Sequence, residues 1–403
     1  MITRPSIALT LVVATAATAI PACGGPAEEA APSVGLLLSY TGQGAADSIN
    51  SERALMMAFE AAEAAGGVGG RPVRIVARDT RSDPSKVLVK AQELLDAGVA
   101  LVIGPDTNDL AIAARSLLGN RTMILPSFAT AAAVEFKTPS WFVMGVTIGQ
   151  VACELMAEMR ADGREKPLLI YNSSGYNTSL AWGLSSRYGV PKIVLPTESE
   201  SPDATLALIA RAKVDSYVLA AFPPAAIQLV FALLATSGIS DSTRWYLSPT
   251  LHSPIFLESL PKGALLGAHG VAQGKVTDGA LFAEQFARRW HDQPLDDSYP
   301  FYDAGALAVL SLQRALVEEG AIPSGDGLRK HLIAVTRPGG VPIRWNELDQ
   351  GLAQLRAGQQ ITYHGLSGPL EFDALGYARG ALTSRWSISS HGFVPSDGNG
   401  DCQ

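Results

Sequence analysis

The stretch Ala64-Ala-Gly-Gly-Val-Gly-Gly-Arg-Pro-Val-Arg-Ile-Val-Ala-Arg-Asp79 decides the fold, because it joins the end of a helix to the start of a strand. Residues 49–65 carry apolar side chains at helical spacing, and the pair Gly66-Gly67 ends that helix. Residues 73–77 then form a short apolar run of strand length. Another such run, residues 34–38, precedes the helix. A strand, a helix and a second strand in this order predict two parallel strands with a helical crossover.

The same alternation continues along the chain. Further strands are expected at residues 100–103, 122–125, 141–144, 168–171, 192–195, 216–220, 245–247 and 264–268. Helices are expected from Asp83-Pro84 to Gly98 and at residues 109–118, 177–188, 202–213, 224–237, 278–291 and 302–320. Continuous apolar strands favour parallel sheets covered by helices on both faces. Because there are too many strands for one compact sheet, the sequence predicts an α/β protein with two doubly wound parallel-sheet lobes and a boundary near Gly145–Gly149.

Composition limits the class of protein. The chain has 403 residues, a formal net charge of −7, 47% hydrophobic residues and 17% charged residues. An acidic balance without a basic tract argues against nucleic-acid binding and against binding to anionic membranes. The apolar content is too high for a disordered chain and sufficient for a large core. With only three cysteines, disulfides cannot be the main support of the fold.

The N-terminus has the pattern of an export signal. Arg4 precedes an uncharged, mostly apolar run from Ser6 to Ile20, which is too short for a comfortable membrane span. The run ends in Ile20-Pro21-Ala22-Cys23, which is typical of a bacterial lipoprotein signal in which Cys23 is acylated and residues 1–22 are removed. The alternative is ordinary secretion with cleavage after Ala17-Thr18-Ala19. Residues 23–33 are rich in Gly, Pro, Ala and Glu and are expected to form a flexible tether.

Polar side chains follow nearly every predicted strand. In open α/β sheets, ligands bind beyond the carboxyl ends of the strands. The candidate ligand-binding residues at these positions are Thr41, Thr107, Asn108, Ser127, Phe128, Ala129, Thr130, Tyr176, Phe222 and Thr250. Hydroxyls, amides and N–H groups near helix starts suit a polar or anionic small molecule, and Tyr176 and Phe222 offer an apolar wall. For each residue alone, helix capping or turn formation is the favoured interpretation. Their recurrence at nearly every strand end favours a ligand site for the set.

Motifs of catalysis and of metal binding are absent from the sequence. It contains no Gly-x-Ser-x-Gly elbow, Walker loop or His-Glu-x-x-His segment, and its six histidines lack metal-ligand spacing. We therefore expect no catalytic residue, cofactor or metal. His252 follows a strand, so it is either a ligand contact or an ordinary surface or core histidine. Cys153 and Cys402 remain beside Cys23, and export permits a disulfide between them, but Cys153 lies in a helical pattern and is equally compatible with simple burial.

Residues from about 34 to 394 resemble the type I periplasmic binding proteins of branched-chain amino-acid ABC importers. The resemblance rests on the stretch from Ala64 to Asp79, Asp83-Pro84, Leu101-Val-Ile-Gly-Pro105, Tyr40-Thr41-Gly42, Tyr302-Asp303-Ala304 and Gly365-Leu-Ser-Gly-Pro-Leu-Glu-Phe-Asp373. It implies two lobes joined by three crossovers that close on a ligand. The implied division is residues 34–146 plus about 274–360 for lobe 1, residues 147–273 plus about 361–394 for lobe 2, and a tail at 395–403.

The resemblance also implies roles for the strand-end residues. Thr107, Asn108 and the segment Phe128–Thr130 match first-lobe positions that hold a ligand carboxylate, and Tyr176 matches the aromatic residue of the second lobe. The acidic residue that holds an α-ammonium in the family should lie in residues 268–273, where this chain has no carboxylate. The family's arginine is also missing from residues 142–147. These departures predict a ligand without an essential ammonium group, or one that is neutralised differently.

Three functions follow from these patterns. The first is a lipid-anchored, monomeric solute receptor in the periplasm or at the cell surface, which passes a small polar or carboxylate-bearing ligand to ABC permease subunits. The second is a sensory or regulatory envelope lipoprotein on the same fold. The third is an envelope enzyme whose site the sequence does not reveal. For the solute receptor and for the regulatory lipoprotein, we expect contact with the membrane only through the lipid anchor and no nucleic-acid partner.

Overall fold

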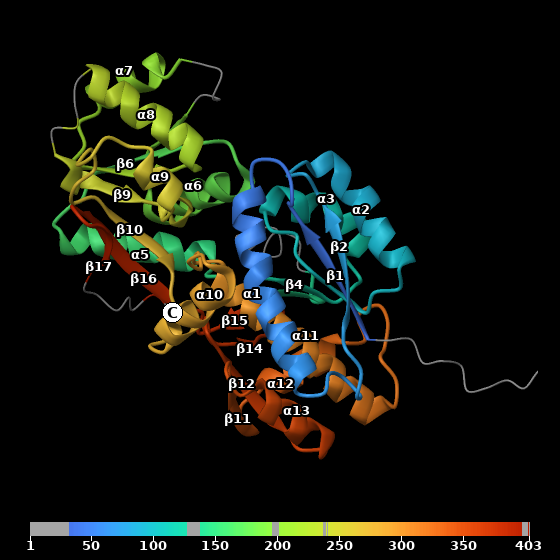
Figure 1. Ribbon diagram of the computed structural model, residues 1–403. Coiled ribbons are helices and arrows are strands. Elements are labelled where there is room, and N and C mark those ends of the chain that lie inside the picture. The colour runs from blue at the N-terminus through green and yellow to red at the C-terminus, as the bar shows by residue number, and fades with distance from the viewer. Residues whose placement is uncertain are drawn as a thin grey trace, which may run out of the picture. The chain divides into compact units, whose positions relative to one another are not determined.

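Figure 1 shows the computed structural model of the chain, in which helices cover two large sheets. The structure describes residues 32–126, 138–195, 201–236, 239, 241–396 and 402. Residues from Pro32 onward form one compact unit. The α/β class and the two parallel-dominated sheets confirm the fold class predicted from the sequence. Within the described ranges, none of the helices is long and apolar enough to cross a membrane.

The first sheet is parallel throughout its described strands. Its order is β2-β1-β3-β4-β5, with bounds β1 Ser33–Leu38, β2 Arg74–Asp79, β3 Leu101–Ile103, β4 Met123–Leu125 and β5 Trp141–Val143. β1 is buried along its whole length and pairs with β2 on one side and β3 on the other. This buried central position explains why its sequence is a continuous apolar run without alternation.

Helices cover both faces of this sheet. α1 (Ala45–Ala64) and α11 (Ser298–Glu319) pack on one face, in a core that includes Leu36, Leu55 and Leu307. α2 (Pro84–Asp96) and α3 (Asn108–Leu118) cover the other face around Leu37. α2 begins where the sequence predicts, because the Asp83 side chain accepts a hydrogen bond from the Ser85 N–H and Pro84 stands at the first helical position.

The second sheet is parallel in its centre and antiparallel at one edge. Its order is β17-β16-β10-β9-β8-β6-β7, with bounds β6 Pro167–Tyr171, β7 Lys192–Val194, β8 Ser216–Ala220, β9 Trp245–Leu247, β10 His269–Gln273, β16 Thr383–Ser389 and β17 Gly392–Pro395. β16 runs antiparallel to β10, and β17 runs antiparallel to β16. The surrounding helices are α5 Ile148–Ala161, α6 Gly175–Tyr188, α7 Asp203–Arg211, α8 Pro223–Thr236 and α9 Pro254–Glu258, with short 3-10 turns η1 Ser242–Arg244 and η2 Pro249–Leu251.

The segment after β10 returns to the first sheet. α10 (Gly279–Trp290) packs its Phe282 and Phe286 against α1, and α11 follows it. The remaining elements are α12 Arg329–Thr336, β11 Val341–Arg344, α13 Leu348–Arg356, β12 Ile361–Gly365, β13 Gly368–Pro369, β14 Glu371–Phe372 and β15 Ala378–Arg379. We call the first sheet with its helices and these returning elements the first lobe, and the second sheet with its helices the second lobe.

The lobe boundary expected near residue 360 is wrong by about twenty residues. Tyr363, Phe372 and Ala378 all lie in the same hydrophobic core as β1 and α11. The buried Asp303 carboxylate holds this segment, because it accepts hydrogen bonds from Tyr363 Oη at 2.8 Å and from the Leu366 N–H at 2.8 Å. The chain therefore enters the second sheet only at β16. The sequence missed this because the short strands β11–β15 carry too few residues to show a period.

A second correction concerns the strand expected at residues 264–268. These residues form turns, and the strand β10 begins one residue later, at His269. Gly263 and Gly267 adopt positive φ angles of 82° and 84°, which a strand does not allow. Leu265 is buried nonetheless, in the core of the second lobe. An apolar run that fills a core from a turn has the same composition as a strand, so the pattern alone could not separate them.

Three chain segments connect the lobes, between β5 and α5, between β10 and α10, and between β15 and β16. Hydrogen bonds tie the segments to one another. The Val146 N–H donates to Gln273 Oε1 at 2.9 Å, and the Gly274 N–H donates to the Leu382 carbonyl at 2.6 Å. These bonds join the first connection to the second and the second to the third.

Candidate functional site

The loops at the carboxyl ends of β1 and β2 are held by one aspartate. Asp79 Oδ1 accepts the backbone N–H groups of Tyr40 at 3.0 Å and Thr41 at 3.2 Å, and Asp79 Oδ2 accepts the Thr41 hydroxyl at 2.7 Å. Burial alone would raise the pKa of Asp79, but these hydrogen bonds lower it. The hydroxyl of Thr41, a predicted ligand contact, therefore donates to Asp79 and holds this loop in place.

Asp106, just after β3, connects two more elements of the first lobe. Its carboxylate accepts the Ser39 hydroxyl at 3.1 Å and forms a short hydrogen bond with the Ser48 hydroxyl. Ser39 follows β1 and Ser48 lies in the first turn of α1. Burial raises the pKa of the Asp106 carboxyl, although these donors act in the opposite direction. The end of β3 and the start of α1 are thus fixed side by side.

Thr107 and Asn108 occupy the start of α3, as expected. Thr107 is the N-cap residue, but its side chain makes no capping hydrogen bond. Asn108 is only 2% exposed, and neither its Oδ1 nor its Nδ2 has a hydrogen-bond partner among the described residues. Buried side-chain amides are normally satisfied, and each exception needs an explanation. A ligand that hydrogen-bonds Asn108 is the explanation that its position at a strand end favours.

The start of α6 presents a matching polar group from the second lobe. Ser174 caps the helix by accepting the Asn177 N–H at 3.2 Å, and Asn177 Nδ2 donates to Asn172 Oδ1 at 2.8 Å. Asn177 is fully buried, yet its Oδ1 has no partner among the described residues. Tyr176 is 2% exposed, and burial together with the Asp297 carboxylate raises its pKa. Tyr176 is therefore a buried side chain at the start of α6, and the first-lobe acid Asp297 is near enough to affect its pKa.

Two contacts bring the lobes together here. The Gly175 N–H donates to Asp109 Oδ2 at 3.2 Å, so the starts of α6 and α3 touch. A Cβ atom on Gly175 would lie 2.4 Å from Asp109 Oδ1, which leaves room only for glycine. On the other side, His252 Nδ1 forms a short hydrogen bond with Asp296 Oδ2. His252 also packs on Trp386, with ring centroids 5.0 Å apart, so it serves as a structural contact between the lobes.

Sequence reasoning missed the acidic residues that lie beside this contact. Asp47 is in the first turn of α1, and Asp296 and Asp297 precede α11. Asn50 brings these segments together, since its Oδ1 accepts the Ser298 hydroxyl at 2.5 Å and the Leu295 N–H at 3.0 Å. Burial raises the pKa of the Asp297 carboxyl well above its ordinary value, and the carboxylates of Asp47, Asp296 and Asp106 raise it further. The adjacent pair Asp296-Asp297 before a helix was the available sequence signal.

The remaining predicted contacts are placed elsewhere or lie outside the described residues. The Thr250 hydroxyl donates to the Ala221 carbonyl at 2.7 Å and shares a hydrogen bond with Ser248, which gives it a role inside a turn. Phe222 is partly buried and its carbonyl accepts the Ala226 N–H at the start of α8. Residues Ser127, Phe128, Ala129 and Thr130, and Cys23, lie outside the described residues.

Residues 268–273, which lack a carboxylate, make hydrogen bonds that support the second sheet and the first connection between the lobes. His269 Nδ1 lies 3.2 Å from Glu158 Oε1, and this hydrogen bond raises the pKa of His269 although burial opposes it. Gln273 accepts the Val146 N–H of the first connection between the lobes. The segment therefore supports β10 and the connection, and the carboxyl group near Tyr176 is that of Asp297 in the first lobe.

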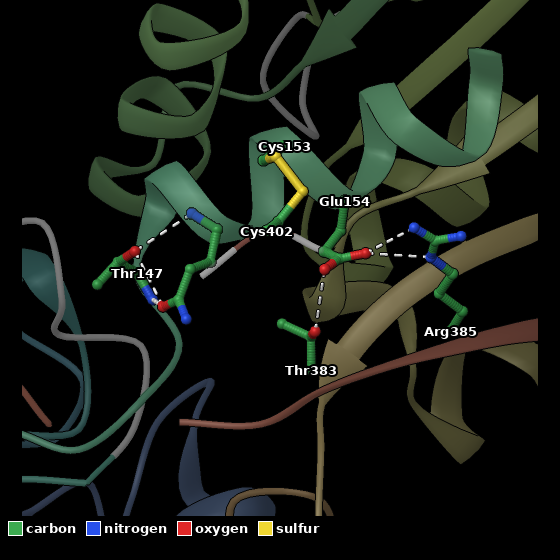
Figure 2. Close-up of a disulfide and its surroundings, with 7 residues drawn as sticks. Thr147, Cys153, Glu154, Thr383, Arg385 and Cys402 are labelled. Atoms are coloured by element: carbon green, nitrogen blue, oxygen red, sulfur yellow. Dashed lines mark hydrogen bonds and ion pairs between the residues drawn. A yellow bond between two sulfur atoms is a disulfide. The ribbon is translucent and has the colours of Figure 1, made fainter. Parts of the chain in front are cut away.

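A disulfide between Cys153 and Cys402 closes a span of 249 residues. Figure 2 shows it on α5, one residue before the buried Glu154. Glu154 Oε2 accepts from Arg385 Nη2 at 2.8 Å and Nε at 3.1 Å, which joins α5 to β16. The sequence did not decide whether Cys153 and Cys402 are paired, and in the structure they form a disulfide. The bond thereby attaches Cys402 to the helix that begins the second lobe.

The fold and the site define a class of protein. Two doubly wound lobes, linked by three connections and touching at polar strand ends, form the architecture of a two-lobed solute-binding protein. Residues 32–373 match the sequence pattern of the family described as "Periplasmic binding protein". The chain belongs to this family, a family of solute-binding proteins and not of enzymes, as the sequence predicts. No curated protein sequence matches the chain.

Solved structures of substrate-binding proteins share this fold at low sequence identity. LivJ, a branched-chain amino-acid substrate-binding protein from Streptococcus pneumoniae in complex with isoleucine, aligns with a TM-score of 0.70 and 16% identity over 91% of this chain and 100% of that chain. The leucine-binding protein LivK from Thermotoga maritima gives 0.71 and 14% over 92% and 99%. A solute-binding protein from R. palustris in complex with benzoate gives 0.66 and 18% over 91% and 95%.

Proposed function

We propose that the protein captures a small polar ligand, an amino acid or an analogue of one, between its two lobes for delivery to an ABC permease. The observation that carries this proposal is the buried Asn108 amide, which has no partner among the described residues although it lies beside the start of α6. A ligand between the lobes satisfies this amide when it binds. Structural neighbours are described with isoleucine and with benzoate, which supports a small ligand of this size class.

The site offers groups for both parts of such a ligand. The start of α3 supplies the Asn108 amide and the backbone N–H groups of a first helical turn, which suit an oxygen-bearing group. Tyr176 comes from the other lobe and offers a rigid aromatic face. Because the two helix starts come from different lobes, a ligand that touches both favours the arrangement in which the lobes are close.

Calorimetry against amino acids, their keto and hydroxy analogues, short amides and aromatic acids tests the proposal. We expect one class to bind, and Asn108→Ala to weaken that binding by about tenfold or more, since a hydrogen bond to a charged ligand group contributes about 1.5–3 kcal/mol. Asn120→Ala, an exposed amide at the other end of α3, is the matched control and should bind like the wild type. An Asn108→Ala variant that folds and binds its ligand with full affinity would contradict the site.

Small-angle scattering separates a transport receptor from a rigid regulatory scaffold. A receptor whose lobes close on its ligand should have a smaller radius of gyration at saturation than without ligand. The same radius in both conditions, with binding proven by calorimetry, favours the regulatory alternative.

We further propose that Cys23 carries a lipid that holds the protein on the outer side of a bacterial membrane. The support is the apolar run that ends in Ala22-Cys23, followed by a tether long enough to free the lobes from the surface. Labelled palmitate should enter the wild-type protein and be absent from Cys23→Ser. Equal labelling of both proteins would show that the export signal is an ordinary secretory one.

A further inference from the structure

The amino ends of the strands in the first sheet form an edge that the candidate ligand site does not use. The described strands of this sheet all pair in parallel, so their amino ends lie along one edge and the candidate site lies at the other. A hollow of about 600 Å³ opens at the amino edge. Its lining includes Gly119 and Pro139, which stand four and two residues before β4 and β5. The volume is within the range of sites that hold small molecules.

The lining of this hollow favours an anion. It includes the cation Arg115 and the hydroxyls of Ser116 and Thr138, and none of its described residues carries a carboxylate. Thr138 is only 7% exposed, and its Oγ1 has no hydrogen-bond partner among the residues that the structure describes. Arg115 stands in the last turn of α3, where a cation stabilises the helix, and a guanidinium has donors enough for a further acceptor. A guanidinium and a buried hydroxyl without an acidic neighbour in the lining suit a phosphate group.

Basic side chains continue beyond the hollow. Arg121 lies in the turn before β4, and Arg329 Nε donates at 2.8 Å to the carbonyl of the proline in the lining. Arg329 and Lys330 line a second, smaller hollow together with Glu319 and Asp326, where the Lys330 ammonium pairs with Glu319 at 2.8 Å. The two acids and the two bases of the smaller hollow balance in charge. Arg121 and the arginine of the first hollow lie outside this balanced group, so the edge is locally basic although the whole chain has a net charge of −7.

The chain enters the fold at the same edge. Pro32 directly precedes β1, and β4 and β5 are the second and third strands from β1 in the sheet. With neighbouring strands about 4.8 Å apart, the hollow lies about 10–15 Å from Pro32 along the edge. Cys23, the proposed lipid carrier, stands nine residues before Pro32. A chain of that length spans about 30 Å when fully extended, so the anchor keeps this edge within reach of the membrane surface.

We propose that this amino edge docks on anionic lipids of the membrane that carries the anchor, with a lipid phosphate in the hollow beside Arg115 and Thr138. The inference rests on the proposed lipid at Cys23 and adds a second contact to it, whereas the sequence predicts contact through the anchor alone. The acidic balance of the whole chain opposes a general attraction to such lipids. The contact therefore depends on the tether, which raises the local concentration of headgroups at this edge. Docking in this way turns the candidate ligand site, at the opposite edge, away from the lipid surface.

Hydrogen exchange on the full lipid-carrying chain tests the proposal. The chain is placed on vesicles of phosphatidylcholine alone or of phosphatidylcholine with phosphatidylglycerol, and exchange is followed in peptides that cover residues 117–122 and 138–141. We expect slower exchange of both peptides only on the vesicles with phosphatidylglycerol, and high salt should remove the slowing because it screens exposed charges. Arg115→Gln should lower the ratio of docked to undocked protein about fivefold, the factor that one basic residue near an anionic surface contributes.

Matched variants and soluble phosphates keep the outcomes apart. Thr138→Val removes the buried hydroxyl at nearly constant side-chain volume and should also weaken docking. Arg211→Gln, in the last turn of α7 in the second lobe, is the matched control and should dock like the wild type. Inorganic phosphate and glycerophosphoglycerol are added to the chain on phosphatidylcholine vesicles. Slowing by either one as large as the slowing by phosphatidylglycerol would show a site for free phosphate and overturn the docking proposal.

The other outcomes are equally decisive. Equal slowing on both kinds of vesicle, no slowing on either, or full slowing in Arg115→Gln and Thr138→Val that thermal melting shows to be folded would overturn the docking proposal. Flotation with the vesicles reports the lipid at Cys23 separately, and calorimetry reports solute binding, so both of those proposals survive such a result. A chain that does not float with either kind of vesicle lacks the anchor, and the docking proposal fails with it.

Discussion

Removing the Cys153–Cys402 disulfide should lower the free energy of unfolding by about 3 kcal/mol. The cross-link closes a span of 249 residues, and in the chain-entropy model such a loop restricts the unfolded chain by about 5.5 kcal/mol at room temperature. The folded protein loses freedom as well. β17 ends at Pro395, and about six residues of sequence separate it from the bonded Cys402. The same model assigns about 2.2 kcal/mol to closing a loop of about that length.

The difference between these two terms gives the expected effect. Urea unfolding of the oxidised wild type should be compared with the double variant Cys153→Ser and Cys402→Ser, which leaves no unpaired thiol at either position. A chain that ends at Ser396 and carries Cys153→Ser should match the double variant, because both lack the cross-link between Cys402 and α5 (Figure 2). A loss below about 1 kcal/mol in the double variant would refute the loop-entropy reasoning. A truncated chain much less stable than the double variant would show that the tail makes other stabilising contacts.

Other variants test the buried polar groups. Asp303→Ala should cost about 3–5 kcal/mol in urea unfolding, since four hydrogen bonds converge on this buried carboxylate, and a loss under about 1 kcal/mol would contradict that role. Glu154→Ala should cost a similar amount by leaving Arg385 without its partner, and replacing both by Leu should recover part of it; no recovery would contradict the ion-pair account. Glu158 raises the pKa of His269, so the stability from this pair is complete below the ordinary histidine pKa of about 6.5 and is lost as pH rises through the folded value. His269→Gln should therefore flatten the stability profile near neutral pH, and an unchanged profile would exclude His269 as its source.

The order of strands and helices could be predicted from the sequence. Apolar runs at 34–38 and 101–103, each followed by an amphipathic helix, indicate buried parallel strands because local periodicity reports which faces are covered. The same reasoning places Asn108 and Tyr176 at strand ends, since the carboxyl ends of parallel strands meet at one edge of a sheet. The structure places these two residues at the starts of α3 and α6, which touch through the Gly175–Asp109 hydrogen bond.

The charge of the site could not be predicted in this way. Asn50 and Ser298, whose hydrogen bond brings the segments of Asp47 and Asp297 together, stand 248 positions apart, and that contact comes from the packing of α1 on α11. The local sequence of either segment does not predict its contact with the other. The lobe boundary was mispredicted for the same reason. Asp303 of α11 accepts hydrogen bonds from the N–H groups of residues 366 and 367, and this contact is distant in sequence. Local sequence determined which elements form, by their periodicity and their caps. Tertiary packing alone decided that the segments of Asp47 and Asp297 lie together, because their proximity depends on helix contacts that no short stretch of sequence encodes.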